Sequence, residues 1–186
     1  MLHRWAQVAG KVRRHYDAET THSTREAYTF VPMSRTHLRA MDTWTYGPYF
    51  PDFDTQAYHD SADSGAEPMT GPAGCHGYAV LAPDGELVGL FEYYFAGDGS
   101  ASIGLALKPE LTGQGRGAGF LEAGIEFLVT RYRYGQPYVY LDVAPTNAPA
   151  LTLYTRAGFE PVEPRDHLGE DVRMRRRLTA PSRPSS

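Results

Sequence analysis

Apolar and polar residues alternate along several short segments of the chain, which is the pattern of strands that bury one face. The segments rich in aromatic and β-branched residues are 27–33, 76–82, 86–95, 101–108, 138–143, 159–163 and 171–178. Glycine-containing turns at 83–85 and 97–99 connect three of them, as hairpin turns connect antiparallel neighbours. The pattern therefore predicts a sheet in which neighbouring strands are often antiparallel.

Other segments repeat apolar residues with the period of a helix. In 117–131 one face carries Phe120, Leu121, Gly124, Ile125 and Leu128. A second helix is expected over 148–157, because Gly158 follows it where helices commonly end, and Ser34 predicts a helix start before 35–44. The order β-α-β-β-β-α-β-α-β-β predicts an α/β domain with a mixed sheet and helices on its faces.

The length of 186 residues suits one well-packed domain and is too short for two ordinary ones. We expect that domain over 26–178. Residues 1–25 are polar and basic with a few apolar positions at helical spacing, which indicates a docking helix, a frayed tail or a homodimer contact. Residues 179–186 have the composition of a disordered end. Residues 61–75, rich in Gly, Pro and Ser, predict a long mobile loop of the kind that often borders a substrate site.

Charge and hydropathy narrow the classes of partner. The net charge of −4 argues against nonspecific binding to nucleic acid, and the basic run at 173–177 fits an edge strand with charged outward positions. No apolar run approaches the roughly 20 residues that span a membrane, and the first residues lack the apolar stretch of a signal peptide. We therefore expect neither a nucleic-acid nor a membrane partner.

The single cysteine, Cys75, excludes an internal disulfide and fits a cytoplasmic protein. Frequent Arg, Ala, Gly and Pro are typical of a GC-rich bacterial genome. The histidines match no zinc-site spacing, so no metal is expected. These observations predict a cytoplasmic, bacterial, metal-free protein.

The strongest chemical signal is the glycine-rich stretch 107–119, between a predicted strand and a predicted helix. Glycines at 113, 115 and 117 allow tight turns that aim several backbone N–H groups at one point. The start of the following helix adds a partial positive charge. The stretch therefore predicts an anion site suited to a pyrophosphate. It lacks the Gly-Lys-Ser/Thr end of a Walker loop, and its spacing and position do not fit a dinucleotide fingerprint.

Two segments in this order resemble the signatures of the GNAT superfamily of N-acyltransferases. The first signature is L-x-V-x-P followed by R/Q-x-x-G-x-G/A. Here Leu105-Ala-Leu107-Lys-Pro109 precedes either Thr112-Gly-Gln-Gly115-Arg-Gly117 or Gln114-Gly-Arg-Gly117-Ala-Gly119, and counting from Pro109 favours the register that begins at Thr112. The second signature, N-x-x-A-x-x-L-Y-x-x-x-G-F, is matched without a gap from Asn147 to Phe159.

The resemblance implies a GNAT-like fold: a mixed, largely antiparallel sheet of six to seven strands, with helices on both faces, splayed between its fourth and fifth strands. It also implies that coenzyme A lies in the gap, with pantetheine along the fourth strand and the pyrophosphate in the glycine loop. The implied residues for acetyl-CoA binding are Leu105, Ala106, Leu107, Thr112, Gly113, Gln114, Gly115, Arg116, Gly117, Ala118, Asn147, Ala150 and Tyr154. Asn147 is also a candidate N-cap of its helix.

The activity implied by the resemblance is transfer of an acetyl group from acetyl-CoA to a primary amine by direct attack. Tyr154 stands where the family has a general acid that protonates the departing thiolate; the alternative is a helix residue that packs on the sheet. Because 101–107 contains no carboxylate, the general base is expected at Glu92, whose pKa would rise if it is buried. Asp98 and Glu110 are weaker candidates, and a surface position is the competing interpretation of Glu92.

The acceptor is expected near the aromatic stretch that follows the first helix. The candidate substrate residues are Trp44, Tyr46, Tyr49, Phe50 and Asp52. Their rings offer apolar contact and Asp52 attracts a cationic amine, although rings that only fill the core are an equal alternative. A small-molecule amine and a peptide amine both fit. A noncatalytic acyl-CoA sensor, or an acyltransferase with a different acyl donor, also remains open.

Overall fold

The computed structural model describes residues 21–22, 28–46, 55–162 and 171–178. The predicted tail 179–186 and most of the predicted N-terminal extension lie outside the described residues. Within that extension, Thr21–His22 (β1) pair with the next strand of the sheet. The extension and tail boundaries stay predictions.

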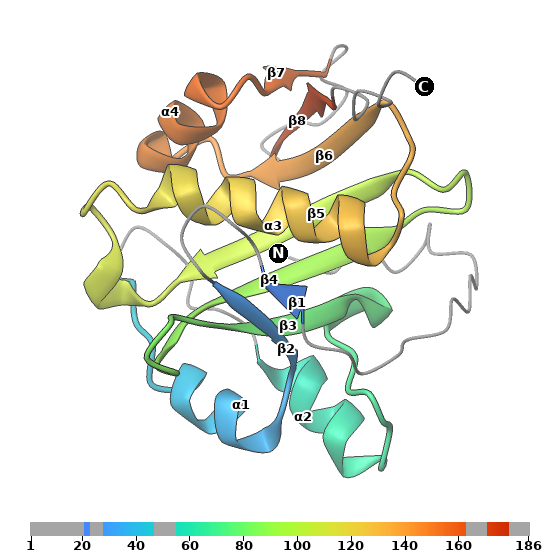
Figure 1. Ribbon diagram of the computed structural model, residues 1–186, viewed down its shortest axis with the longest axis vertical. Coiled ribbons are helices and arrows are strands. Elements are labelled where there is room, and N and C mark those ends of the chain that lie inside the picture. Colours follow the sequence, from blue (N-terminus) through green and yellow to red (C-terminus); the bar gives the residue numbers. More distant parts are fainter. Residues whose placement is uncertain (1–20, 23–27, 47–54, 163–170, 179–186) are drawn as a thin grey trace, which may run out of the picture.

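In the part of the chain that the structure describes, eight strands form one sheet in the order β1-β2-β3-β4-β5-β6-β8-β7 (Figure 1). Besides β1 they are β2 (Thr29–Pro32), β3 (His76–Leu81), β4 (Leu87–Phe95), β5 (Ala101–Leu107), β6 (Tyr138–Val143), β7 (Glu160–Pro161) and β8 (Val172–Arg177). All neighbours are antiparallel except β5 and β6, which are parallel. The mixed, largely antiparallel sheet is confirmed, and two of its strands, β1 and β7, are only two residues long.

The expectation of an edge strand at 171–178 is wrong. β8 lies between β6 and β7, so β7 holds the edge. Alternating charges could not distinguish the two positions, because they reflect the faces of a strand and not its hydrogen-bonding edges. On these faces Arg175 pairs with Glu160 at 3.0 Å, and Arg176 pairs with Glu122 of a neighbouring helix.

β5 and β6 pair over a very short length. Only Ala101↔Val139 and Ser102↔Tyr140 are in register, although β5 continues to Leu107 and β6 to Val143. The two strands therefore separate beyond Ser102, which confirms the expected splay between the fourth and fifth predicted strands.

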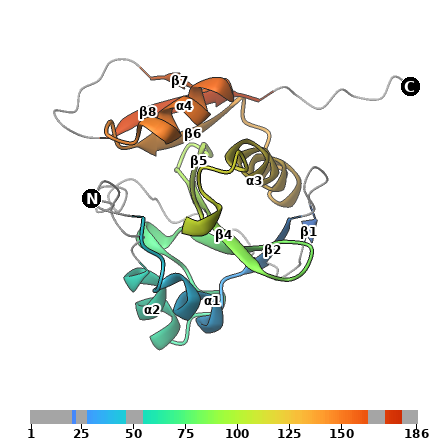
Figure 2. The same cartoon turned by 90° about the vertical axis from the view of Figure 1, so that its left-hand side faces the viewer.

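Among the described residues, four α-helices flank the sheet: α1 (Arg35–Met41), α2 (Gln56–Asp63), α3 (Gly117–Arg131) and α4 (Ala148–Arg156). α1 and α2 lie on one side of the sheet and α3 on the other (Figure 2). Ser34 caps α1 as predicted, because its hydroxyl accepts from His37 N at 3.3 Å. α3 has its predicted bounds, and Gly158 follows α4 with φ of 84°.

Each side of the sheet has its own apolar core. α3 and α4 contribute to the first core, in which Phe30, Phe91, Phe120 and Phe127 are all buried. α1 and α2 contribute to the second core. In the first core Gly124 lets α3 approach β4, since a Cβ there would overlap the Phe91 ring. Near the start of α3, the Phe120 ring packs on Gly89 of β4, whose partner in β5 is Leu107.

The predicted loop at 61–75 is shorter than expected, and part of it is packed into the fold. Its first residues belong to α2, Thr70 pairs with His76, and both Met69 and Cys75 are buried in the second core. Glycine and proline produced the loop interpretation, but here they allow close packing: a Cβ on Gly71 would overlap the Tyr58 ring of α2.

Candidate functional site

The glycine-rich stretch forms a turn that leads from β5 into α3. Gly113 and Gly115 have φ of 72° and 76°, a left-handed conformation that disfavours side chains. The bond from Phe120 N to Arg116 O, at 3.0 Å, is the first of the helical series. The N–H groups of the residues between Arg116 and Phe120 therefore have no acceptor within the helix and point to its N-terminal end. This end can hold an anion.

The side chains of the loop mostly stabilise the turn itself. Thr112 Oγ1 donates to Pro109 O at 2.7 Å, and Gln114 Nε2 donates to Glu110 O at 2.6 Å. Arg116 is the N-cap residue of α3, with no side-chain capping bond. Any anion in this turn would thus be held chiefly by backbone groups.

Beyond Ser102, one edge of β5 faces the gap that opens where β5 and β6 separate. Lys108 N donates to Val88 O at 2.8 Å, just beyond the Gly89↔Leu107 pair. Because backbone groups in an antiparallel ladder alternate between facing the partner and facing away, those of Leu105 and Leu107 point away from β4. The Leu107 carbonyl accepts a bond from the Tyr46 hydroxyl at 2.7 Å, which agrees with this direction.

Glu92 is a buried carboxylate and not the surface residue of the competing interpretation. Its side chain is 3% exposed and lies on the face of the second core. Its Oε1 accepts from the Tyr58 hydroxyl at 2.8 Å and the Cys75 thiol at 3.5 Å, and its Oε2 accepts from the Tyr94 hydroxyl at 2.8 Å. These bonds offset much of the cost of burying a charge.

The carboxylate of Glu92 also extends over β5. Glu92 is paired with Gly104, and a Cβ on Gly104 would lie 2.8 Å from Glu92 Oε2. Gly104 comes two positions after Ser102, the last residue of β5 that pairs with β6. The carboxylate therefore lies over the first part of β5 whose outer edge is unpaired.

The groups that donate to Glu92 are themselves poor acids. Burial raises the pKa of Tyr58, Tyr94 and Cys75 well above their ordinary values, and the negative charge of Glu92 raises each pKa further. These three groups therefore stay protonated at neutral pH and act as donors to Glu92.

α4 brings Asn147 and Tyr154 to the opposite face of the sheet. Asn147 Oδ1 accepts from Ala150 N at 3.1 Å, so the predicted N-cap is confirmed, and Ala150 is partly buried against the first core. Tyr154 is 8% exposed in that core, and burial raises the pKa of its hydroxyl to about 12. Leu153 touches the start of α3, since a Cβ on Gly117 would lie 3.0 Å from its Cδ2.

The predicted acceptor residues separate in the structure. Trp44 is buried in the second core. This agrees with the alternative in which rings of the aromatic stretch only fill the core. Tyr46 is partly buried, and its hydroxyl reaches β5. Tyr49, Phe50 and Asp52 lie outside the described residues.

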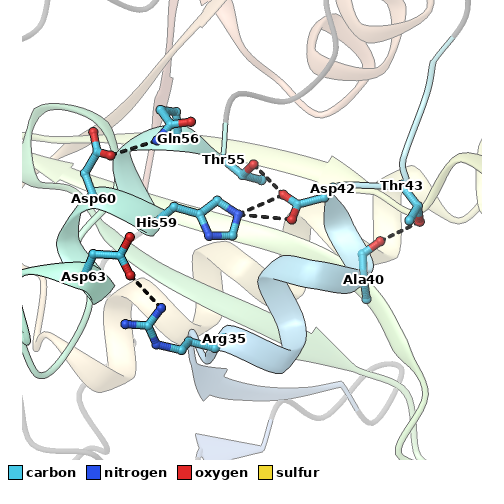
Figure 3. A network of polar contacts seen from close by, with 9 residues as sticks. All are labelled: Arg35, Ala40, Asp42, Thr43, Thr55, Gln56, His59, Asp60 and Asp63. Atoms are coloured by element: carbon cyan, nitrogen blue, oxygen red, sulfur yellow. Dashed lines mark hydrogen bonds and ion pairs between the residues drawn. The ribbon is translucent and has the colours of Figure 1, made fainter.

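A polar network fixes α2 against α1. Asp42, at the end of α1, accepts from Thr55 Oγ1 at 2.6 Å and contacts His59 Nε2 at 3.1 Å (Figure 3). Arg35 bonds Asp63 Oδ1 at 2.8 Å. The network attaches α2 to α1. Because α2 carries Tyr58, the network also helps to fix the position of the hydroxyl that donates to Glu92.

Tyr58, Cys75, Tyr94 and Gly104 were not identified from the sequence as parts of this site. Tyr58 and Cys75 are 34 and 17 residues from Glu92, so no local spacing relates them to it. Only Tyr94, two residues from Glu92, carried a usable signal, because residues i and i+2 of a strand share a face.

Within the described ranges no cluster of three or more His, Cys, Asp or Glu side chains could hold a metal ion. None of the helices in these ranges combines the length and the apolarity that a membrane-spanning helix needs.

A model of the acetyltransferase (GNAT) family matches residues 38–159. A mycothiol acetyltransferase from Clavibacter michiganensis is 36% identical over 102 residues, which are 54% of this chain and 31% of that protein. The match thus spans about a third of the length of this relative.

Solved structures with this fold include a spermidine N-acetyltransferase chimera from Vibrio cholerae and hSSAT. It has a TM-score of 0.62 at 19% identity and covers 81% of this chain and 95% of that one. A Bordetella pertussis protein described as a GNAT-family acetyltransferase has a TM-score of 0.57 at 20% identity, with 85% and 99% covered. These likenesses show the fold. The family model matches more than half of the chain, and the chain therefore belongs to the GNAT acetyltransferase family.

Proposed function

We propose that this protein transfers an acetyl group from acetyl-CoA to a primary amine of a small molecule or peptide. Two observations support the proposal: Glu92 and Tyr154 are buried on opposite faces of the sheet, and β5 and β6 stop pairing after Ser102. Direct transfer needs a base on the side of the entering amine and an acid on the side of the leaving thiolate, because both groups bond the same carbonyl carbon.

The residues present fit coenzyme A. The N–H groups at the start of α3 suit its pyrophosphate, and the outward backbone of Leu105 and Leu107 suits the amides of pantetheine, as an added strand would pair. The helix begins at Gly117, which supports the register that begins at Thr112. When bound, acetyl-CoA supplies the thioester whose acetyl group is transferred.

Glu92 is proposed as the general base. An attacking amine must lose a proton, and a carboxylate over Gly104 lies about one strand spacing, roughly 5 Å, from a strand added at the open edge of β5. Three protein donors hold this carboxylate in place. It is therefore preorganised and shielded from water, as a base that works on one bound amine should be.

Tyr154 is proposed as the general acid. With a pKa of about 12 its hydroxyl is fully protonated at neutral pH, so a proton is always available. Transfer to a thiolate of ordinary pKa, about 8.5, is unfavourable. Because the thiolate would leave into the same buried surroundings, desolvation raises its pKa too and reduces the mismatch.

Replacement of Tyr154 tests the acid role. We expect Tyr154→Phe to lower kcat by about 100-fold or more while the Kd of coenzyme A, measured by calorimetry, stays unchanged. Tyr140→Phe, on β6, is the matched control and should retain its rate. A Tyr154→Phe enzyme with wild-type kcat would remove Tyr154 from the mechanism.

A thermal-shift titration separates this proposal from a protein that binds no cofactor. A ligand at 100 times its Kd stabilises the fold by about 2.7 kcal/mol, so acetyl-CoA should raise Tm by several degrees. No shift with acetyl-CoA or free coenzyme A would contradict cofactor binding. A shift without any acetylated amine product would favour the sensor.

A further inference from the structure

The three groups that donate to Glu92 differ in their access to the surface. Tyr58 is 0% exposed and Cys75 is 2% exposed, and both serve Oε1. Tyr94 is only partly buried and serves Oε2, the oxygen that lies over Gly104. Oε1 of Glu92 is thus bonded only by fully buried groups, whereas Oε2 is bonded by a residue that is partly exposed.

This arrangement restricts how an amine can deliver a proton to Glu92. The carboxylate is almost fully buried, and the neighbouring strand position is a glycine with no side chain to assist. Tyr94 precedes Phe95 at the end of β4 and is paired with Ser102, the last β5 residue before the strands separate. Its hydroxyl bonds Glu92, and its ring lies 3.6 Å from where a Cβ on Gly104 would be, just past the point where β5 and β6 separate.

We propose that the Tyr94 hydroxyl is a proton relay between the acceptor amine and Glu92. The proposal rests on the proposed role of Glu92 as base. As the amine attacks, its N–H bond breaks and a new O–H bond forms on Tyr94. In the same step the original Tyr94 O–H bond breaks and the proton moves 2.8 Å to Glu92 Oε2. The neutral amine nitrogen bonds the acetyl carbonyl carbon while the carbonyl π pair moves to its oxygen. Loss of the proton leaves that nitrogen neutral, Glu92 becomes the neutral acid, and Tyr94 ends as it began.

The relay does not require a tyrosinate. Burial and the charge of Glu92 both raise the pKa of Tyr94, so its ionised form is strongly disfavoured. A concerted shift of two protons avoids that form, because the oxygen gains one proton as it loses the other. Tyr58 also carries a hydroxyl that donates to Glu92, but its side chain is 0% exposed. It therefore keeps the carboxylate in position and does not transfer a proton from the amine.

Two conservative variants distinguish the relay from mere support of Glu92. Tyr58→Phe and Tyr94→Phe each remove one hydroxyl bond to the carboxylate, so each should raise the pKa of Glu92 and move the acid limb of the kcat/KM profile to higher pH. Only Tyr94→Phe removes the hydroxyl through which the proposed relay moves the proton. We expect it to lower the high-pH plateau by about tenfold or more, and Tyr58→Phe to lower it much less.

The profiles are measured on the full chain with acetyl-CoA and three primary amines: phenethylamine, 1,4-diaminobutane and an alanyl dipeptide. Rates are also measured in mixtures of H₂O and D₂O. The shape of their dependence on the D₂O fraction would not change if Tyr94 only supported the structure. Two protons in flight predict a curved dependence on the D₂O fraction for the wild type and a weaker curvature for Tyr94→Phe. Equal plateaus for the two variants, or unchanged curvature in Tyr94→Phe, would overturn the relay.

Glu92→Gln separates failure of the relay from failure of the proposed base. If Glu92→Gln loses activity while Tyr94→Phe keeps its plateau, the base stands and the relay falls. If Glu92→Gln keeps full activity, or if none of the amines is acetylated, the proposed function of Glu92 itself fails, and the relay fails with it.

Discussion

Single residues with no side chain decide where Glu92 can lie. A Cβ on Gly104 would meet Oε2 of Glu92, and a Cβ on Gly77 would overlap the Tyr58 ring whose hydroxyl bonds Oε1. The groups that these two added Cβ atoms would meet differ in how freely they can move. A carboxylate at the end of a flexible chain can move aside, whereas a buried ring cannot, because the core around it is closely packed.

We therefore expect opposite consequences from two identical substitutions. Gly104→Ala should displace the Glu92 carboxylate and lower kcat/KM by about tenfold or more, with a small change in the free energy of unfolding. Gly77→Ala should cost about 1–3 kcal/mol of stability through overpacking. Urea unfolding and steady-state kinetics measure both. A Gly104→Ala enzyme with wild-type activity would show that the position of Glu92 does not matter.

At the scale of elements, the turn between β5 and α3 is the part of the site that depends on backbone conformation. Gly113 and Gly115 hold left-handed φ values in open space, so a side chain there would be strained without any clash. Gly99, in the turn between β4 and β5, has φ of 82° and is equally open. An alanine at position 99 would be strained in the same way, and Gly99 is not part of the glycine-rich loop.

Gly115→Ala and Gly99→Ala form a matched pair. Each should destabilise the fold by about 1–2 kcal/mol, since each forces a side chain into a left-handed conformation. Only Gly115→Ala should also weaken acetyl-CoA binding, because relaxation of its turn moves N–H groups that suit a pyrophosphate. Calorimetric Kd values and unfolding free energies provide the comparison. Equal Kd values in the two variants would exclude the loop as the pyrophosphate site.

Elements differed in how far the sequence could predict them. α3 was predicted with its correct bounds because seven of its residues are buried along the helix. α2 was missed: only Tyr58 and Ala62 are buried in it, and Thr55 provides no side-chain cap. The glycine loop and Tyr154 were identified from local motifs. The contacts around Glu92 could not be, since they depend on α2 and on residues brought together only by folding.

On the scale of the whole molecule, two buried or bonded titratable groups couple stability to pH. Burial and Arg131 lower the pKa of His76, whose Nδ1 lies 2.9 Å from the Tyr132 hydroxyl. The Thr55 hydroxyl and His59 lower the pKa of Asp42. Both groups bind protons less readily in the folded state than in the unfolded chain, so acid favours unfolding at each.

The histidine and the aspartate act in different pH ranges. The stabilising effect of neutral His76 is complete above its unfolded pKa of about 6.5 and declines as pH falls below it. That of Asp42 is present above about pH 4 and is lost at lower pH. We expect His76→Phe to lose less stability than the wild type between pH 7.5 and pH 5.5. Identical losses in urea unfolding at those two pH values would contradict a role for His76.

Acetyl transfer itself is tested most directly by detecting its product. The purified full chain is incubated with acetyl-CoA and each of the three primary amines, and the acetylated amine is quantified by mass spectrometry beside the Glu92→Gln/Tyr154→Phe double variant. An N-acetylated product from at least one amine, formed by the wild type and reduced to background in the double variant, is the predicted result. Acetylation at equal rates by both proteins, or none with any amine despite bound acetyl-CoA, would contradict it.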